Sequence, residues 1–248
     1  MTKSATESEY LSSYDPKDFD APLTTVDIAI FTIHNKELKV LLSKRNNFPE
    51  REKWGLPGGF INLQKDADLG SAASRKLHEK TGLTTSHLEQ VATRGNAIRD
   101  PRGWSVTILY MALIAWDELS ITQHTTAEET KWAELQSILP QGDLAFDHSE
   151  LILECFERLK AKVQYTLLPV SMLEKTFTLT ELQEAFQIIL GQDLEKKSFR
   201  RRVLESQMLI ETDQIKRGSN RPAKLYEAKK HAASHYFVRN IEGSRAKA

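Results

Sequence analysis

The chain has 248 residues, of which 40% are hydrophobic and 27% are charged, and its 34 basic side chains balance its 34 acidic ones. This composition is that of an ordinary soluble globular protein, and the length is comfortable for two domains. A single cysteine, Cys155, excludes an internal disulfide framework and a cysteine-based zinc site, and no apolar run is long enough to span a bilayer.

The charge is unevenly distributed along the chain. Residues 1–164 carry 19 basic and 24 acidic side chains, a balance of −5, whereas residues 165–248 carry 15 and 10, a balance of +5. Such an asymmetry favours a polyanionic partner for the C-terminal part, although a charged run is more often only a solvated face.

The N-terminal half is expected to hold an α/β domain. Roughly the first twenty residues are polar, read as an extended arm and contain no secretory signal, so we expect a cytoplasmic protein without a membrane partner. Residues 24–33 and 38–45 are short apolar runs around a polar turn and predict a hairpin. Further strands are predicted near residues 88–93, 105–116 and 130–133, and an amphipathic helix over residues 144–163.

A helix is also predicted over residues 66–80, with Asp66 or Asp68 as its N-cap and Gly82 closing it. Beyond Tyr165 the pattern changes to a helix at residues 179–190, a second at 196–208 and two short strands around a basic turn. This order is expected of a winged helix-turn-helix.

Residues 58–83 carry a chemical motif. A "WGLPGGFI" stretch is followed by Arg75, Lys76, Leu77, His78, Glu79, Lys80, Thr81, Gly82 and Leu83. This resembles the Nudix box, in which a loop glutamate precedes the pattern Arg-Glu-apolar-any-Glu-Glu-any-Gly-apolar. Two glutamates of that pattern are lysines here, two extra residues separate the glycines from the arginine, and the loop glutamate has no clear counterpart.

The substitutions change the chemistry of this helix. Glutamates at i, i+3 and i+4 share one face and offer oxygen ligands to Mg²⁺ or Mn²⁺, which neutralise a pyrophosphate and activate water. Here that face presents Lys76, Glu79 and Lys80, so metal-dependent hydrolysis is expected to be absent or vestigial. Asp66 and Asp68 are substitute ligands in one interpretation and helix caps in the simpler one.

Two interpretations of the lysines stay open. Either Lys76 or Lys80 stands where the metal would, neutralising the pyrophosphate of a bound ligand, or both are solvated or paired with Glu79. Arg99 and Arg102 flank Asp100 in a loop before a strand, which suits a phosphate or ribose clamp, or else surface turn charges.

The sequence suggests limited roles for two further residues near the predicted helix at 144–163. Asp147 is either a pocket residue or the cap of the helix it precedes. His148 is a lone histidine and is expected to be structural rather than catalytic.

The basic segment "EKKSFRRRVLES" predicts a recognition helix. Phe199 and Val203 fall on one face and should be buried, while Lys197 and Arg201 lie nearly opposite and should reach base edges. Arg200 and Arg202 fall on the two flanks and should contact phosphates, and the hairpin tip suits backbone or minor-groove contact. The expected DNA-binding residues are Lys197, Ser198, Arg200, Arg201, Arg202, Lys216, Arg217 and Arg221.

Over nearly its full length the chain resembles the Nudix-related transcriptional regulators of bacterial NAD metabolism, the NrtR family. The segments that carry the resemblance are "YDPKDF", "WGLPGGFI", "RKLHEKTG", "RDPRGWSV", "AFDH", "KSFRRRV" and "RPAKLY". The resemblance implies a mixed α+β, α/β fold, with a Nudix-like α/β/α sandwich on a mixed sheet over residues 1–163 and a winged helix-turn-helix over residues 164–248.

The resemblance also implies a function: a homodimeric repressor that binds palindromic operators of NAD synthesis or salvage genes and senses ADP-ribose or a related nucleotide. Residues 147–163 are the expected transmitter between the domains. No catalytic residue, metal or cofactor is expected. The expected ligand-binding residues are Arg45, Gly58, Gly59, Arg75, Lys76, Glu79, Lys80, Arg99, Asp100 and Arg102. The alternative is a metal-dependent ADP-ribose or nucleoside-diphosphate-sugar pyrophosphatase whose C-terminal domain serves assembly.

Overall fold

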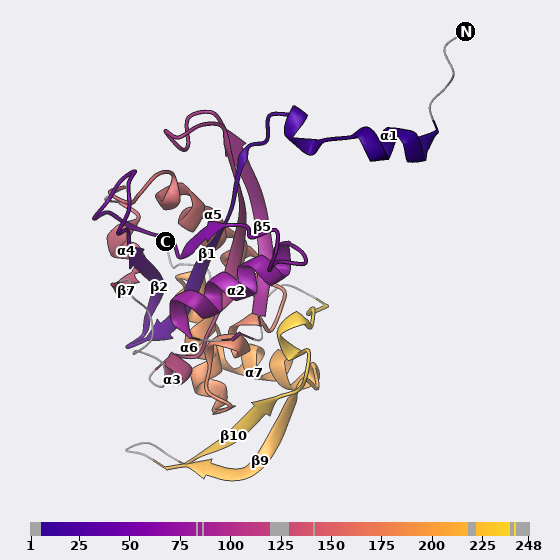
Figure 1. The fold of residues 1–248 in the computed structure, drawn as a ribbon. Helices are drawn as coiled ribbons and strands as arrows, with labels where there is room; N and C mark the ends of the chain where they lie inside the picture. The colour runs from indigo at the N-terminus through magenta and orange to yellow at the C-terminus, as the bar shows by residue number, and fades with distance from the viewer. Residues whose placement is uncertain are drawn as a thin grey trace.

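The computed structural model describes residues 6–82, 84–85, 87–119, 129–140, 142–217, 222–238 and 241. Figure 1 shows a larger N-terminal part built on a β-sheet and a smaller C-terminal part of helices and a hairpin packed against its lower end. Among the described residues, none of the helices has the length and apolar character that a membrane crossing requires.

Within the described ranges, the N-terminal sheet has seven strands in the order β3-β2-β1-β6-β5, with β4 paired to β1 and β7 paired to β2. β1 and β6 run parallel and the other pairs are antiparallel, so the sheet is mixed, as predicted. The strands are β1 (Leu23–His34), β2 (Glu37–Lys44), β3 (Trp54–Gly55), β4 (Gly58–Phe60), β5 (His87–Asn96), β6 (Ser105–Leu113) and β7 (Thr130–Glu134).

The predicted hairpin is formed by β1 and β2. Its turn uses Asn35 and Lys36, whose φ angles are 53° and 63°. Two consecutive residues with positive φ are typical of the two-residue turns that match the twist of a hairpin. The segment predicted as one strand over residues 105–116 ends earlier, because Trp116 already belongs to the short helix α3.

Helices cover both faces of the sheet and complete the predicted α/β/α layering. Alternate residues of β1 point to opposite sides: Ile28 and Ile30 pack with Leu77 of α2, and Phe31 packs in the cluster that holds Leu159 of α5. The helices of this part are α1 (Glu7–Ser13), the 3-10 turn η1 (Pro16–Asp18), α2 (Leu69–Thr81), α3 (Trp116–Leu119), α4 (Leu135–Ile138) and α5 (His148–Val163).

The N-terminal arm is partly helical rather than fully extended. α1 begins with a capping box between Thr6 and Glu9, yet none of its residues is buried. Figure 1 shows this arm standing away from the sheet.

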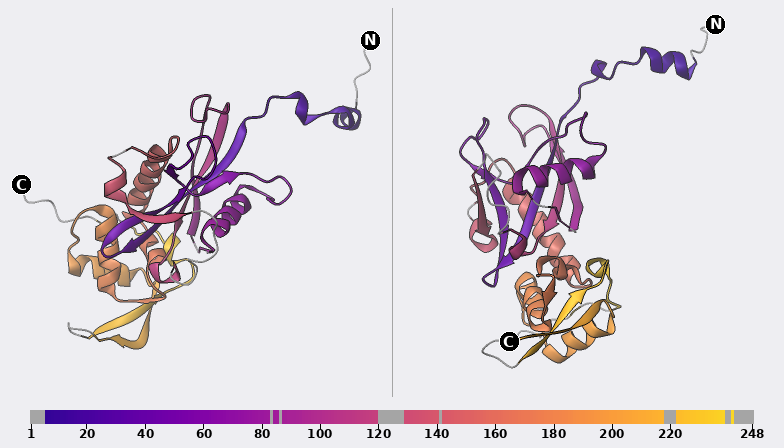
Figure 2. Two further views of the ribbon diagram at one scale, coloured as in Figure 1. Left: turned by 60° about the vertical axis from the view of Figure 1, so that its left-hand side comes forward. Right: turned by 60° about the horizontal axis from the view of Figure 1, so that its bottom comes forward.

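The C-terminal part has the predicted order of two helices and a hairpin. A buried stripe on α6 that includes Phe186 packs against Phe199 of α7, with ring centroids 5.1 Å apart. β8 adds a third strand to the hairpin. Figure 2 shows the hairpin, in yellow, beside the helices of the C-terminal part. The elements are η2 (Leu168–Met172), β8 (Thr176–Phe177), α6 (Leu179–Leu190), α7 (Lys196–Glu205), β9 (Leu209–Lys216), β10 (Ala223–Ala228) and η3 (Ala232–Ser234).

A single buried cluster joins the two parts. It runs from Phe31 on β1 through Leu159 and Val163 on α5 to Leu182 and Phe186 on α6. α5 therefore begins in the N-terminal part and ends inside the core of the C-terminal part.

Candidate functional site

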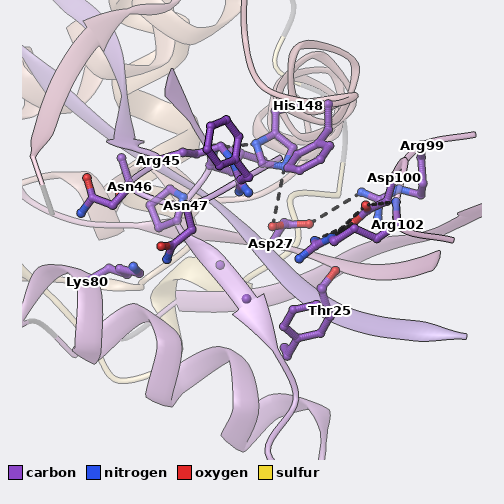
Figure 3. A pocket seen from close by; sticks show the side chains of 18 residues that line it. Thr25, Asp27, Arg45, Asn46, Asn47, Lys80, Arg99, Asp100, Arg102 and His148 are labelled. Atoms are coloured by element: carbon purple, nitrogen blue, oxygen red, sulfur yellow. Dashed lines mark hydrogen bonds and ion pairs between the residues drawn. The ribbon is translucent and has the colours of Figure 1, made fainter. Parts of the chain in front are cut away.

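A cavity of about 230 Å³ opens on the N-terminal sheet, between the end of α2 and the start of α5. Figure 3 shows basic side chains converging on it from several loops, with Lys80 extending from α2. Several predicted ligand residues line it, namely Arg45, Gly58, Gly59, Lys80, Arg99, Asp100 and Arg102. The other predicted ligand residues, Arg75, Lys76 and Glu79, lie on α2 outside this lining.

The buried carboxylate of Asp27 lies in the wall of the cavity. Thr107 donates a hydrogen bond of 2.7 Å to its Oδ2, and Nη2 of Arg99 lies 3.8 Å from the same oxygen. Sequence reasoning missed Asp27. The sequence did contain a signal, because Asp27 stands between apolar residues of a predicted strand. A charged side chain at such a position is rarely buried unless it has a polar partner.

His148 also lines the cavity and is held as a neutral ring. The backbone N–H of Leu56 donates to its Nδ1 at 2.8 Å, so the ring proton lies on Nε2, which faces Oδ1 of Asp27 at 3.8 Å. Burial lowers the pKa of His148 and outweighs the attraction of Asp27 and Asp147. The ring therefore links the β3 loop to the first turn of α5.

Arg99 and Arg102 are each engaged by a carboxylate. Arg99 makes two hydrogen bonds of 2.9 Å to the two oxygens of Asp147 and is almost fully buried. Arg102 makes a similar fork on Asp100, and this pairing is the main reason that the pKa of Asp100 is lowered. The loop is therefore a preorganised wall of the cavity. Asp147 is the N-cap residue of α5, but its carboxylate makes no capping hydrogen bond to the helix and binds Arg99 instead.

Arg45 forms the opposite wall. Its Nε donates to the carbonyl of Pro49 at 3.1 Å, and its guanidinium lies 4.5 Å from the ring centroid of Phe146. Burial, followed by repulsion from Arg102, lowers its pKa. Four basic side chains and two carboxylates thus line the cavity, which suits an anionic ligand.

The helix α2 is capped as the sequence predicted. Asp68 is the N-cap, with its carboxylate accepting from the backbone N–H of Ser71, and Gly82 closes the helix with a φ of 70°. Asp66 has a different role, because both of its oxygens accept hydrogen bonds of 2.6 Å from Arg75. Its side chain is only 2% exposed, and the bonds from Arg75 lower its pKa to about 2.

Glu79, the one glutamate that remains of the Nudix-box pattern, is engaged by two cationic side chains. Glu79 accepts from Arg75 at 2.9 Å through one oxygen and from Lys76 at 3.0 Å through the other. Because the oxygens of Asp66 and Glu79 face these cations, this donor set does not suit a divalent metal. In the described part of the chain, no group of three or more His, Cys, Asp or Glu side chains is placed to hold a metal.

The two lysines of the box have different positions. Lys76 pairs with Glu79 and lies against Gly59, where an added Cβ would come within 3.2 Å of its Cε. Lys80 lines the cavity. Pairing with Glu79 is therefore found for Lys76, and contact of Lys80 with a phosphate stays a prediction.

The second candidate site is the exposed face of α7. Phe199 and Val203 are buried, as the helical pattern predicted, while Lys197 and Arg201 are exposed. Glu195 caps the helix by accepting from the backbone N–H groups of Lys197 and Ser198. These positions leave Lys197 and Arg201 accessible to a nucleic acid.

The flanking arginines are less exposed than the helical wheel predicted. Arg200 is partly buried and donates to the hydroxyl of Thr180 at 3.1 Å, while its Nε is buried without a hydrogen-bond partner. Arg202 is partly buried beside the segment that contains Tyr236. Helix packing, which a single-helix wheel omits, accounts for this difference.

The hairpin β9–β10 has the expected basic residues at the start of its tip. Lys216 ends β9 and pairs with Glu181 at 2.5 Å, and Arg217 follows it as an exposed residue. Arg221 lies outside the described residues.

Comparison with known protein families identifies two domains in the chain. The NUDIX domain matches residues 23–155, and the NrtR DNA-binding winged helix domain matches residues 169–228. The first range contains every residue that lines the cavity, and the second contains α6, α7 and the hairpin.

Two proteins of known description resemble the chain, one of them through two crystal structures. The "ADPR responsive transcriptional repressor NtrR" of Acinetobacter baylyi is 47% identical over 96% of this chain and 94% of its own. A crystal structure of Shewanella oneidensis NrtR complexed with a 27mer DNA has a TM-score of 0.84 and 44% identity, covering 89% of this chain and 100% of that one. The NUDIX domain of the same Shewanella protein, complexed with ADP ribose, has a TM-score of 0.56 and 46% identity, covering 62% and 99%.

Proposed function

The chain belongs to the NrtR family, in which a NUDIX domain is joined to a DNA-binding winged helix, and we propose that it is an ADP-ribose-responsive transcriptional repressor. The related proteins described above bind DNA or ADP ribose, or respond to ADP ribose. In this proposal the repressed genes serve NAD synthesis or salvage, as they do in the family that the sequence resembles.

One observation carries the sensing role. Arg75 and Lys76 hold the oxygens of Glu79, while Lys80 joins Arg45, Arg99 and Arg102 at the cavity. A pocket of this kind attracts a pyrophosphate through its cations but offers no carboxylate cluster to assemble the metals that cut it. Ligand binding without hydrolysis is the consequence, and no catalytic residue, metal or cofactor is assigned.

The transmitter in this proposal is α5. Its first turn faces the cavity through His148, and Asp147 just before it holds Arg99. Its last turns, with Leu159 and Val163, are buried in the cluster that includes α6. A ligand that engages Arg99 would change the contacts at one end of a rigid rod whose other end is embedded in the winged helix. We place the boundary between domains 1–163 and 164–248 at the end of this helix.

The DNA in this proposal is a palindromic operator read by a homodimer. Two copies of α7 related by a two-fold axis would present Lys197 and Arg201 to half-sites that are separated by one helical turn or a multiple of it. Such a protein acts where the genome is, which in a bacterial cell is the cytoplasm.

The decisive experiment is DNA binding to the upstream regions of the protein's own neighbouring genes, measured with and without ADP-ribose and with NAD as a comparison ligand. We expect salt-dependent, sequence-specific binding that ADP-ribose weakens. A complete lack of salt-dependent duplex binding would contradict the regulator. Tighter DNA binding with ADP-ribose would still support a sensing role, but with the opposite direction of response.

The alternative of a metal-dependent ADP-ribose or nucleoside-diphosphate-sugar pyrophosphatase is favoured by the NUDIX match over residues 23–155. It needs carboxylates that are available to a metal, whereas Glu79 and Asp66 are engaged by Arg75 and Lys76. Hydrolysis of ADP-ribose with Mg²⁺ or Mn²⁺ at ordinary enzyme turnover would support this alternative against the sensor.

A further inference from the structure

A second cavity, of about 210 Å³, lies where the two parts of the chain meet. Its upper wall comes from the end of β1 and from α3, and its lower wall from β8 and the first turn of α6. Three carboxylates from both parts line it: Asp117, Glu174 and Glu181. We call these three residues the acidic junction.

Lys216, at the start of the hairpin tip, forms an ion pair with one carboxylate of the acidic junction. Nζ of Lys216 lies 2.5 Å from Oε1 of Glu181, and the two side chains are 53% and 35% exposed. The other oxygen of Glu181 accepts from the backbone N–H of Thr178 at 2.8 Å and so belongs to the capping box of α6. Glu181 is therefore held in place by the cap of α6, and Lys216 reaches it from the end of β9.

Charges in both parts of the chain act on this lysine. The hydrogen bond to Glu181 raises the pKa of Lys216, and the charges of Glu174 and Asp117 raise it further. Glu174 in turn lines the same cavity as Asp117, and the interaction between the two carboxyl groups, followed by burial, raises the pKa of Glu174. The carboxylate of Asp117 thus connects α3 of the N-terminal part with the residues that hold Lys216.

We propose that the acidic junction is a latch that competes with DNA phosphate for Lys216, so that the N-terminal part tunes the DNA affinity of the hairpin. The proposal rests on the DNA-binding function proposed above. It differs from the α5 route because it acts through charge at the opposite end of β1, and it assigns Glu181 and Asp117 as positioning residues.

The competition follows from the chemistry of the ammonium group. A lysine that binds phosphate releases counterions from DNA, whereas a lysine already neutralised by a carboxylate contributes less to that release. Because a partly exposed ion pair is a weak competitor, removing it should raise DNA affinity by about two- to five-fold at low salt.

Glu181→Gln tests the latch, because glutamine keeps the acceptor for the capping box and removes only the charge. Glu211→Gln is the matched control: Glu211 pairs with Lys224 on the same hairpin, is 48% exposed and gives the same change in net charge. DNA binding by both full-length variants is measured over a range of salt concentrations, with thermal unfolding as the check on folding.

We expect Glu181→Gln to tighten DNA binding more than Glu211→Gln, and to steepen the dependence of log K on log salt by about one phosphate contact. In a Lys216→Gln background this extra gain should disappear. Asp117→Asn, in the other part of the chain, should produce a smaller gain in the same direction, with Asp143→Asn as its control.

Equal gains from Glu181→Gln and Glu211→Gln would overturn the latch, because they would reflect net charge alone. A gain that persists without Lys216 would overturn it as well. If Asp117→Asn matches its control, the N-terminal part has no role and the interdomain form of the proposal is wrong. Absence of DNA binding by every protein, including the wild type, would instead contradict the proposed function from which the competition starts.

Discussion

Arg99 and Asp147 meet through two parallel hydrogen bonds of 2.9 Å, although 48 residues separate them in the chain. The arginine belongs to the cavity wall, and the aspartate immediately precedes α5. This fork joins the cavity wall directly to the residue that precedes α5, the helix whose other end is buried with α6.

Asp147→Asn should destabilise the protein and reduce its response to ADP-ribose. The asparagine keeps one acceptor but leaves the buried Arg99 without a full counter-charge, which should cost about 1–3 kcal/mol of unfolding free energy. Chemical denaturation measures the loss, and DNA binding with and without ADP-ribose measures the response. Asp143→Asn is the control, since Asp143 is exposed in the preceding loop. Unchanged stability and response would show that the fork is dispensable.

Lys80→Gln should weaken ADP-ribose binding without affecting the fold. A charge-assisted contact with the pyrophosphate is worth about 1–3 kcal/mol, and glutamine removes the charge with a polar side chain that is only one atom shorter. Calorimetric titration with ADP-ribose provides the measurement. Lys65→Gln, an exposed lysine in the loop before α2, should leave the affinity unchanged. Equal affinities for wild type and Lys80→Gln would place the pyrophosphate elsewhere in the cavity.

Gly58→Ala should disrupt the cavity because the glycine touches its wall. An added Cβ would lie 2.4 Å from both Oδ1 of Asp27 and the carbonyl oxygen of Val26, so the backbone must shift. The expected destabilisation is about 1–3 kcal/mol, together with loss of ligand binding. Gly70→Ala is the control, because it lies in α2 where its nearest neighbour is at ordinary contact distance. A Gly58→Ala protein with wild-type stability would contradict the tight packing described above.

Glu89→Gln should lower stability at neutral pH and have little effect in acid. Burial raises the pKa of Glu89, but its contacts with His87, Lys162 and Arg158 outweigh this and lower the pKa to about 2. A lowered folded-state pKa gives stability that is present above the ordinary value of 4.5 and is lost as the pH falls towards 2. The difference from wild type should be about 1–3 kcal/mol at pH 7 and should shrink below pH 4.5. Urea unfolding at several pH values measures it.

The control for Glu89→Gln changes a second glutamate. Glu157→Gln alters an exposed glutamate on the same helix α5 and should give a small difference that does not vary with pH. If both variants behave alike, the ion pairs that hold α5 to β5 contribute nothing measurable.

Arg201→Ala should weaken specific DNA binding by about 1–3 kcal/mol and relax the sequence preference at one base position. Arg201 is exposed on α7, opposite the buried Phe199 and Val203. Arg200→Ala should instead reduce affinity similarly for all sequences, because Arg200 lies on the flank of α7, next to Thr180 of α6, and is expected to contact backbone phosphate and not a base edge. Competition assays with operator variants distinguish the two effects. An Arg201→Ala protein with unaltered sequence preference would remove Arg201 from the set of base-reading residues.

The parts of the fold that follow from local sequence were predicted well. The hairpin of β1 and β2 needs only two apolar runs and a polar turn, and Gly82 and Gly191 close their helices because each adopts a left-handed conformation. The buried stripe of Phe199 and Val203 likewise follows from helical spacing alone.

The pairings that decide the site depend on tertiary structure and were not predictable from the sequence. Asp27 is one strand residue among many until the fold brings Thr107 and His148 to it. Arg99 and Asp147 are far apart in the chain, and the sequence left the role of each open. Arg75 reaches back to Asp66 across the start of α2, a pairing that neither helical spacing nor capping rules anticipate.

The buried cluster that joins β1, α5 and α6 makes the two parts one cooperative folding unit. A polypeptide cut after Val163 would uncover the apolar side chains at the end of α5, and the separated winged helix would lose the apolar surface against which α6 packs. Full-length chains should accordingly melt in a single transition, and each half expressed alone should melt at a lower temperature than the full-length chain. Recombination in evolution that replaced one part would have to preserve this shared interior.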